Sequence, residues 1–285
     1  MSVRKTRPGF AAARAALASL YLASFGAAAA HAAGGPITVD AELVFAVDIS
    51  RSMNRPEQEL QRAGYVAALT SPEFRDALRA NPLGKVAIAY VEWSAVDDQK
   101  VLLNWTLIDS AESAQAAADK LATAPYRRAS RTSISGGIDF SARQFDNNGF
   151  SSSREVIDVS GDGPNNSGRP VTEARADALA KGIVINGLPL VGIRPYTGFA
   201  DIENLDVYYQ DCVIGGEGAF MVTVHDTKDF VAATRTKLVR EIAMTGPGEH
   251  PPLIQLAQAD VPRISCMIGE SRSGGGTYYT PPPGR

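Results

Sequence analysis

The chain of 285 residues is 45% hydrophobic and 21% charged, which suits one or two globular domains and excludes a disordered or collagen-like polypeptide. Its 28 Lys and Arg residues stand against 31 Asp and Glu residues, for a formal net charge of −3. This balance argues against a nucleic-acid-binding surface, because such surfaces need clustered positive charge.

Residues 1–32 have the pattern of a secretory signal peptide. Basic residues up to Arg14 precede an Ala-rich apolar segment at 15–30, and Ala30-His31-Ala32 offers a small-x-small cleavage site. A membrane anchor is the alternative, but the segment is short and weakly hydrophobic against the ~20 residues that a span needs. We therefore expect cleavage near Ala32, a periplasmic or secreted product without a membrane span, and a mature chain with 24 basic against 31 acidic residues.

Strand-like and helix-like segments alternate over residues 40–245, which we expect to form one domain. Apolar runs predict strands at 42–47, 86–91, 101–107, 155–159, within 183–193, and at 219–224. Helical spacing of apolar residues predicts helices at 56–70, 110–123, 135–146, 170–181 and 227–244, with a short helix or irregular segment at 199–209.

The order of these segments predicts the fold class. Strands that alternate with helices imply an α/β fold with a doubly wound, mostly parallel sheet and helices on both faces. The short polar connection at 97–100 favours a hairpin, and hence one antiparallel edge strand.

Residues 246–285 are rich in Pro and Gly and read as a tail, although 253–268 are apolar enough to dock on the domain. The two cysteines, Cys212 and Cys266, lack the spacing of zinc or thioredoxin-like sites. In an oxidising compartment they could form a disulfide. Two buried free thiols are the alternative.

Oxygen-bearing side chains occur in three separate segments of the predicted domain. Asp48, Ser50 and Ser52 follow the first strand, Asp162 follows the strand at 155–159, and Thr132 precedes a helix. The first group alone could be a helix N-cap. Because ligands of open α/β sheets bind beyond the carboxyl ends of the strands, and Mg²⁺ prefers oxygen ligands, the three segments together predict a metal site.

The same three segments carry a family resemblance. Residues 45–53, 131–134 and 160–166 resemble the three parts of the metal-ion-dependent adhesion site of von Willebrand factor type A (vWA) domains, and the likeness extends over residues 40–243. The chain further resembles an uncharacterised group of exported bacterial vWA-like proteins, on the segments 156–163 and 208–216.

The resemblance implies a ligand set and a partner. It implies that the hydroxyls of Ser50, Ser52 and Thr132 coordinate Mg²⁺, or else Mn²⁺ or Ca²⁺, and that Asp48 and Asp162 act directly or through water. Such a site leaves the cation under-neutralised and with an open position. A protein partner that presents an Asp or Glu carboxylate is therefore the expected final ligand.

Four residues depart from the family pattern or complicate it. Arg51 places a cation beside the site, Gly161 stands where many relatives have Thr, and Ser133 is an alternative ligand to Thr132. Asp158 interrupts an apparently buried strand. An unpaired buried carboxylate is costly, so we expect Asp158 to have a hydrogen-bonding partner or to face a strand edge.

The sequence favours a binding module over an enzyme. The expected mature chain contains only His225 and His250, and it has no nucleophile elbow, phosphate-binding loop or dinucleotide-binding glycine pattern. Two alternatives remain: a structural or scaffold module of the same fold without metal dependence, and a hydrolase that uses a metal at Asp48 and Asp162.

Overall fold

The computed structural model describes residues 1, 35–191, 202–243 and 263–273. Its centre is a five-stranded sheet in the order β4-β3-β2-β6-β7, and β1 and β5 form a separate parallel pair. The strands are β1 (Ile37–Thr38), β2 (Glu42–Asp48), β3 (Val86–Trp93), β4 (Gln99–Ile108), β5 (Phe150–Ser151), β6 (Glu155–Gly161) and β7 (Val184–Pro189).

The pairing of the strands confirms the predicted fold class. β2 runs parallel to β3 and β6, and β6 runs parallel to β7. Only β4 is antiparallel, to β3, at the edge of the sheet. The carboxyl ends of β2 and β6, which carry Asp48 and Asp162, therefore lie side by side.

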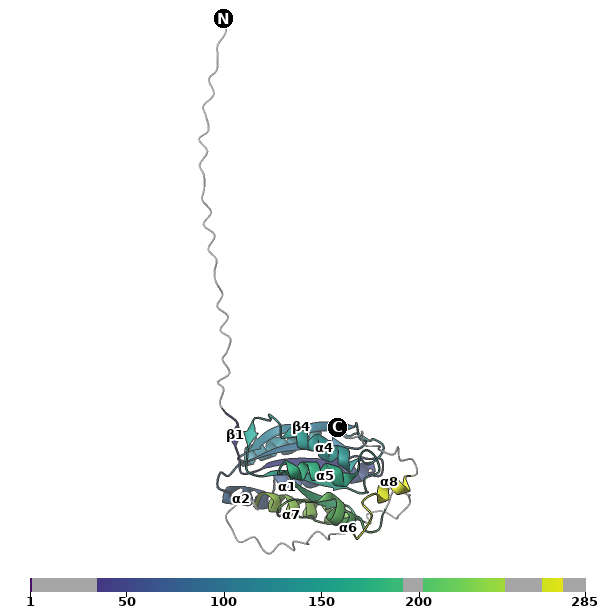
Figure 1. Ribbon diagram of the computed structural model, residues 1–285. Coiled ribbons are helices and arrows are strands. Elements are labelled where there is room, and N and C mark those ends of the chain that lie inside the picture. The colour runs from purple at the N-terminus through teal and green to yellow at the C-terminus, as the bar shows by residue number, and fades with distance from the viewer. Residues whose placement is uncertain (2–34, 192–201, 244–262, 274–285) are drawn as a thin grey trace. The chain divides into compact units, whose positions relative to one another are not determined.

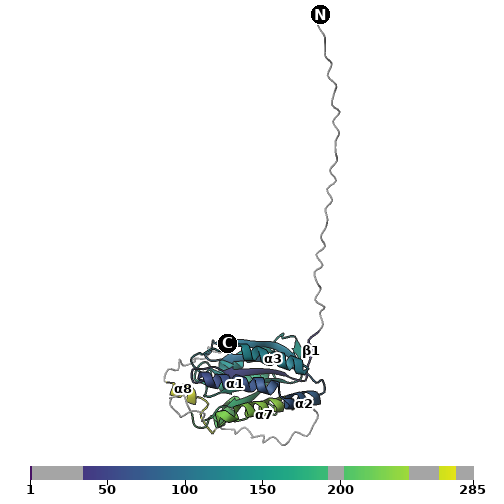
Figure 2. The same cartoon turned by 180° about the vertical axis from the view of Figure 1, so that it is seen from behind.

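Helices cover both faces of this sheet. One apolar core contains residues of α4, α5 and the π-helix η1, and the other contains residues of α1, α2, α3 and α7. Figure 1 shows α4 and α5 on one face, and Figure 2 shows α1, α3 and α7 from behind. The helices are α1 (Arg55–Leu69), α2 (Pro72–Ala80), α3 (Ala111–Thr123), α4 (Ile134–Gln144), α5 (Val171–Ala180), α6 (Leu205–Tyr208), η1 (Tyr209–Val213), the 3₁₀ turn η2 (Thr227–Asp229), α7 (Phe230–Ala243) and α8 (Ile268–Arg272).

The central strand β2 explains why its sequence is apolar at nearly every position. Leu43, Phe45 and Val47 pack into the core beneath α1. Val44 and Ala46 pack into the core on the opposite face. A strand covered on both faces cannot alternate apolar and polar residues, so the continuous run at this position correctly predicted a buried parallel strand.

Two sequence predictions need correction. The strand predicted at 219–224 is reduced to isolated bridges, from Met221 to Gly187 in β7 and from Val224 to Leu190 just after β7. The N–H groups of Val222 and Val224 donate to the carbonyls of Gly187 and Pro189, so the segment lies along β7 without a continuous ladder. The helix α2 was not predicted, although Ser71 caps it and Pro72 occupies its first turn.

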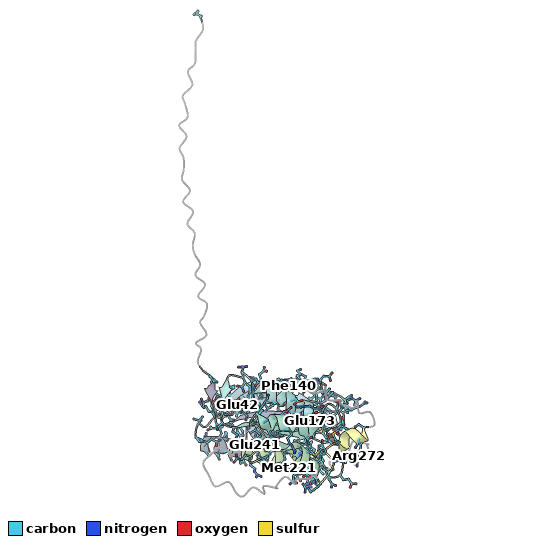
Figure 3. All side chains as sticks on the ribbon, in the orientation of Figure 1. Glu42, Phe140, Glu173, Met221, Glu241 and Arg272 are labelled. Atoms are coloured by element: carbon cyan, nitrogen blue, oxygen red, sulfur yellow. A yellow bond between two sulfur atoms is a disulfide. The ribbon has the colours of Figure 1, made fainter. Side chains whose placement is uncertain are left out.

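Asp158 has the partner that its burial requires. Its Oδ1 lies 2.6 Å from Nζ of Lys237 in α7, which also pairs with Glu241 at 2.7 Å. Glu241, labelled in Figure 3, accepts hydrogen bonds from Asn186 in β7 at 2.8 Å and forms an ion pair with Arg154 at 3.2 Å. The predicted partner of Asp158 is thus confirmed, and the cluster fixes α7 to β6 and β7.

A disulfide links Cys212 and Cys266, as the sequence analysis allowed. It attaches residues 263–273 to η1, and Arg263 adds an ion pair to Asp211 at 2.8 Å. Asn165 donates a hydrogen bond to Glu270 of α8 at 2.7 Å, so α8 rests on the loop that follows β6.

The predicted signal peptide and His250 lie outside the described residues. Across the part of the chain that the structure describes, none of the helices has both the length and the apolar character to cross a membrane.

Candidate metal centre

The centre begins where β2 ends, at Asp48. Asp48 is fully buried, and its Oδ1 accepts a hydrogen bond of 2.6 Å from the backbone N–H of Ser50. The N–H of Met53 then donates to the carbonyl of Ser50 at 2.9 Å. These two bonds close a tight turn and hold the hydroxyls of Ser50 and Ser52 next to each other, with 2.8 Å between their oxygens.

This oxygen cluster does not cap a helix. The N-cap of α1 is Asn54, whose side chain accepts from the N–H of Glu57 at 3.0 Å, while Glu57 accepts from the N–H of Asn54 at 2.8 Å. The reciprocal pair satisfies the end of the helix. Asp48, Ser50 and Ser52 therefore do not cap α1, which was the alternative explanation for this oxygen cluster.

Asp162 joins the cluster from the neighbouring strand. The hydroxyl of Ser52 donates to Oδ1 of Asp162 at 2.6 Å. Four of the five predicted ligand residues, Asp48, Ser50, Ser52 and Asp162, are thus connected by short hydrogen bonds. Their convergence follows from the adjacent, parallel pairing of β2 and β6.

Thr132, the fifth residue, is tied to the same rim by its backbone. Its N–H donates to Oδ1 of Asn166 at 2.9 Å, and its carbonyl accepts from the N–H of Asn166 at 2.8 Å. Ser133 has a different task, because its hydroxyl accepts from the N–H of Gly136 to cap α4 and donates to the carbonyl of Ser167 at 2.8 Å. Thr132 is therefore the better ligand candidate of the two.

The electrostatics of the centre favour a bound cation. Burial, and then the negative charge of Asp162, raise the pKa of Asp48 well above its ordinary value, against the opposing hydrogen bond from Ser50. Two carboxylates that are held together in a buried place repel each other. A divalent cation would remove this repulsion and stabilise both ionised forms.

The donor set also fits a hard divalent cation. Oδ2 of Asp48 is buried and has no hydrogen-bond partner among the described residues, so an acceptor is left over that a cation or its water can use. Within the described ranges, no three His, Cys, Asp or Glu side chains are grouped so as to hold a metal. The centre therefore depends on hydroxyls, and all of its candidate ligand atoms are oxygens, as Mg²⁺ prefers.

Three residues of the centre escaped the sequence analysis. Asn165 and Asn166 read as turn residues, yet Asn165 accepts from the N–H of Ser135 at 2.9 Å and Asn166 binds Thr132. Tyr209 lies beside Asp48, more than 150 positions away in the sequence. The turn signal at 165–166 was visible in the sequence, but nothing local marks Tyr209.

Comparison with known proteins agrees with this architecture. Residues 38–246 match the family described as "Protein of unknown function (DUF1194)". The chain belongs to this family. No functionally curated protein sequence matches this DUF1194 member.

Several solved structures are similar to this chain. The pilus adhesin SpaC from Lactobacillus rhamnosus GG matches with a TM-score of 0.51 and 13% identity, over 74% of this chain and 31% of the adhesin. Proximal thread matrix protein 1 from the mussel byssus matches with a TM-score of 0.48 and 15% identity, over 73% of this chain and 46% of that protein. A von Willebrand factor type A protein from Catenulispora acidiphila has a TM-score of 0.49 and 14% identity, over 74% of this chain and 43% of its own.

The DUF1194 chain thus spans less than half of each of these three proteins. The pilus adhesin, with its TM-score of 0.51, supports the predicted α/β fold. At these levels of identity the likeness concerns the fold alone.

Proposed function

We propose that this protein is an exported, divalent-metal-dependent protein-binding module of the adhesion type, which captures an acidic group of its partner. The observation that carries the proposal is the convergence of Asp48, Ser50, Ser52 and Asp162 through hydrogen bonds of 2.6 to 2.8 Å, beside a buried and unused oxygen of Asp48. A cation at this place would be held by the hydroxyls of Ser50, Ser52 and Thr132. Asp48 and Asp162 would act directly or through water.

When bound, the cation supplies an open position for an acidic ligand. Neutral hydroxyls leave most of its charge uncompensated, so a partner carboxylate gains a strong electrostatic attraction. Mg²⁺ is the cation that we propose, with Mn²⁺ or Ca²⁺ as alternatives. The protein's own residues fix the oxygens in place, and Ser52 is the partly exposed member of the set.

The charge of the surrounding loops supports an acidic partner. Arg51, Arg128 and Arg131 are exposed. Arg51 lies between the two Ser ligands, and Arg131 directly precedes Thr132. Nη2 of Arg128 donates to the carbonyl of Arg51 at 3.0 Å, so the two basic loops lie together. Within the described ranges, none of these three guanidinium groups forms an ion pair with an acidic side chain, which leaves them available to a partner.

We also propose that the protein is not an enzyme. In the described part of the chain the histidine is His225, and no nucleophile and base were recognisable in the sequence. The disulfide supports an oxidising compartment, which fits export to the periplasm or beyond.

The test begins with the purified mature protein and Mg²⁺. We expect Mg²⁺ to raise the melting temperature of the wild type and to have no such effect on Asp48→Ala, because a ligand that binds only the native state stabilises it. Asp76→Ala, at an exposed carboxylate of α2, should respond like the wild type. An equal melting temperature with Mg²⁺ and with EDTA in the wild type would refute the metal site.

Partner capture from envelope extracts, with and without Mg²⁺, then tests the binding role. Capture that requires Mg²⁺ and disappears in Asp162→Ala supports the proposal. Capture that survives both EDTA and Asp162→Ala would indicate a scaffold without metal dependence. Turnover of phosphoesters or peptides that is lost in Asp48→Ala would indicate a hydrolase instead.

A further inference from the structure

Two buried polar atoms without hydrogen-bond partners among the described residues lie close to Gly161. These atoms are Oη of Tyr209 and Oδ2 of Asp48. A Cβ atom built on Gly161 would lie 2.9 Å from the first and 3.0 Å from the second. A buried donor and a buried acceptor that are both unpaired are costly and rare, so their placement around one residue needs an explanation.

Two glycines make room for the Tyr209 ring. Gly161 ends β6, and Gly187 lies in the adjacent β7. A Cβ on Gly187 would come within 2.9 Å of Cδ1 of Tyr209. A larger residue at either position would push against the ring or its hydroxyl. The absence of side chains on both strands is therefore what allows the hydroxyl to approach Asp48.

The segment that carries Tyr209 is held from outside the sheet. Tyr209 begins the π-helix η1, whose wide turn is closed by the bond from the N–H of Ile214 to the carbonyl of Tyr209 at 2.9 Å. Short π-helical segments often occur at functional sites. Three positions after Tyr209, Cys212 forms the disulfide with Cys266, so a covalent link supports the same segment.

The phenol of Tyr209 can serve as a donor. The ordinary pKa of a tyrosine phenol is about 10, so the hydroxyl carries its proton at neutral pH. It is an uncharged donor that faces a carboxylate, and a hydrogen bond to an ionised acceptor is stronger than one between neutral groups.

We propose that Tyr209 is a positioning residue of the metal centre, whose hydroxyl donates to Oδ2 of Asp48, directly or through one water, and holds this carboxylate in its cation-facing orientation. The inference rests on the proposed function, because it assigns a residue to the same site. In this account Gly161 and Gly187 leave room for the Tyr209 side chain, and the disulfide-linked π-helix holds it in place.

The test compares two adjacent tyrosines. Mg²⁺ affinity is measured by titration calorimetry for the wild type, Tyr209→Phe and Tyr208→Phe. Residues that orient metal ligands typically change metal affinity by about 10- to 100-fold, and we expect a loss of that size for Tyr209→Phe. Tyr208 is equally buried, but its hydroxyl accepts from the N–H of Asn165 at 3.1 Å. Its variant should therefore stay within about threefold of the wild type, since the lost bond does not involve a ligand residue.

Far-UV circular dichroism and urea unfolding establish that both variants are folded. If the wild type binds Mg²⁺ and Tyr209→Phe binds it within threefold, the inference fails while the proposed function stands. Equal weakening in both variants would also overturn it, because the effect would then come from general packing. If the wild type binds no Mg²⁺, the proposed function fails and takes this inference with it.

A second pair of variants keeps the tyrosine. Gly161→Ala places a methyl group within 3.0 Å of both the Tyr209 hydroxyl and Oδ2 of Asp48, whereas Gly163→Ala adds the same group where nothing lies within 4 Å. We expect Gly161→Ala to weaken Mg²⁺ binding as Tyr209→Phe does and Gly163→Ala to leave it unchanged. Unchanged binding in a folded Gly161→Ala would contradict the proposed contact.

Discussion

Replacing Lys237 by Met should destabilise the protein strongly, because it leaves buried carboxylates without their cation. Nζ of Lys237 lies 2.6 Å from Asp158 and 2.7 Å from Glu241, and all three side chains are buried. Met keeps most of the volume of the aliphatic stem, so the packing of the stem is largely preserved. The change therefore acts mainly on the charges.

The expected loss can be estimated from what each carboxylate retains. Glu241 keeps Asn186 at 2.8 Å and Arg154 at 3.2 Å, whereas Asp158 keeps no ion-pair partner among the described residues. Breaking a buried ion pair by removing one partner costs about 3–5 kcal/mol, and the remaining partners of Glu241 favour the lower part of this range. For a domain of this size, that corresponds to a melting temperature roughly 6–15 °C lower.

Urea unfolding, followed by circular dichroism, measures the change in the free energy of unfolding. Lys228→Met is the matched control, because Lys228 pairs with Asp226 at 2.9 Å on the surface, and such a pair should contribute nothing measurable. The double variant Lys237→Met/Asp158→Asn should recover part of the loss. A loss below ~1 kcal/mol in Lys237→Met, or no recovery in the double variant, would refute this account of the cluster.

Three further predictions concern pH, the disulfide and the basic loops. Burial raises the pKa of Asp158 to about 6 despite the opposing charge of Lys237. Because the pKa in the unfolded chain is lower, the stability contributed by Asp158 is present at low pH and is lost as the pH rises through about 6. The stability of the wild type relative to Asp158→Asn should therefore fall by up to ~2 kcal/mol between pH 4.5 and 7.5 in urea unfolding, and a constant or rising difference would contradict this sign. Cys212→Ser/Cys266→Ser should lower the free energy of unfolding by up to about 4 kcal/mol, since the bridge spans 54 positions. The same variant should weaken Mg²⁺ binding. If neither the free energy of unfolding nor the Mg²⁺ affinity changes, the bridge supports neither the fold nor η1. Arg51→Gln/Arg131→Gln should weaken the binding of poly-L-glutamate several-fold at low ionic strength, and the difference should vanish near 1 M salt. Mg²⁺ binding should not weaken in this variant, and Arg79→Gln, at the exposed pair in α2, should change neither measurement. Equal polyglutamate binding by the wild type and the double variant would exclude the basic loops from the partner surface.

The buried cluster and the metal centre share one strand. Asp158 lies within β6, and Asp162 follows the end of this strand. Lys237 and Glu241 thus anchor, through Asp158, the strand that delivers one side of the centre. This position explains how a charged residue is tolerated in an otherwise apolar strand, since its pairing offsets much of the cost of burial.

The sequence by itself determined the elements and the approximate place of the site. Continuous apolar runs predicted the buried strands β2, β3 and β6 because both faces of each are covered. The polar turn between β3 and β4 predicted the antiparallel edge strand. Asp48 and Asp162 were recognisable because they stand directly after strands, where a parallel sheet gathers its ligands.

Other features depended on contacts that have no local signature. Residues 219–224 look like a strand in sequence, but in the structure they make only the isolated bridges at 221 and 224. Asn54 caps α1. The sequence alone did not show that the residues of the oxygen cluster have no part in this cap.

Only the tertiary structure placed the Tyr209 hydroxyl near Asp48. Both atoms lie close to Gly161, the Tyr209 ring lies close to Gly187, and the π-helix that carries Tyr209 is linked by the Cys212–Cys266 disulfide. Periodicity records which face of an element is buried, whereas it carries no information about which distant residue fills the remaining space. For this protein the sequence therefore located the rim at which we propose cation binding, and the packing of distant segments decided which other residues lie around it.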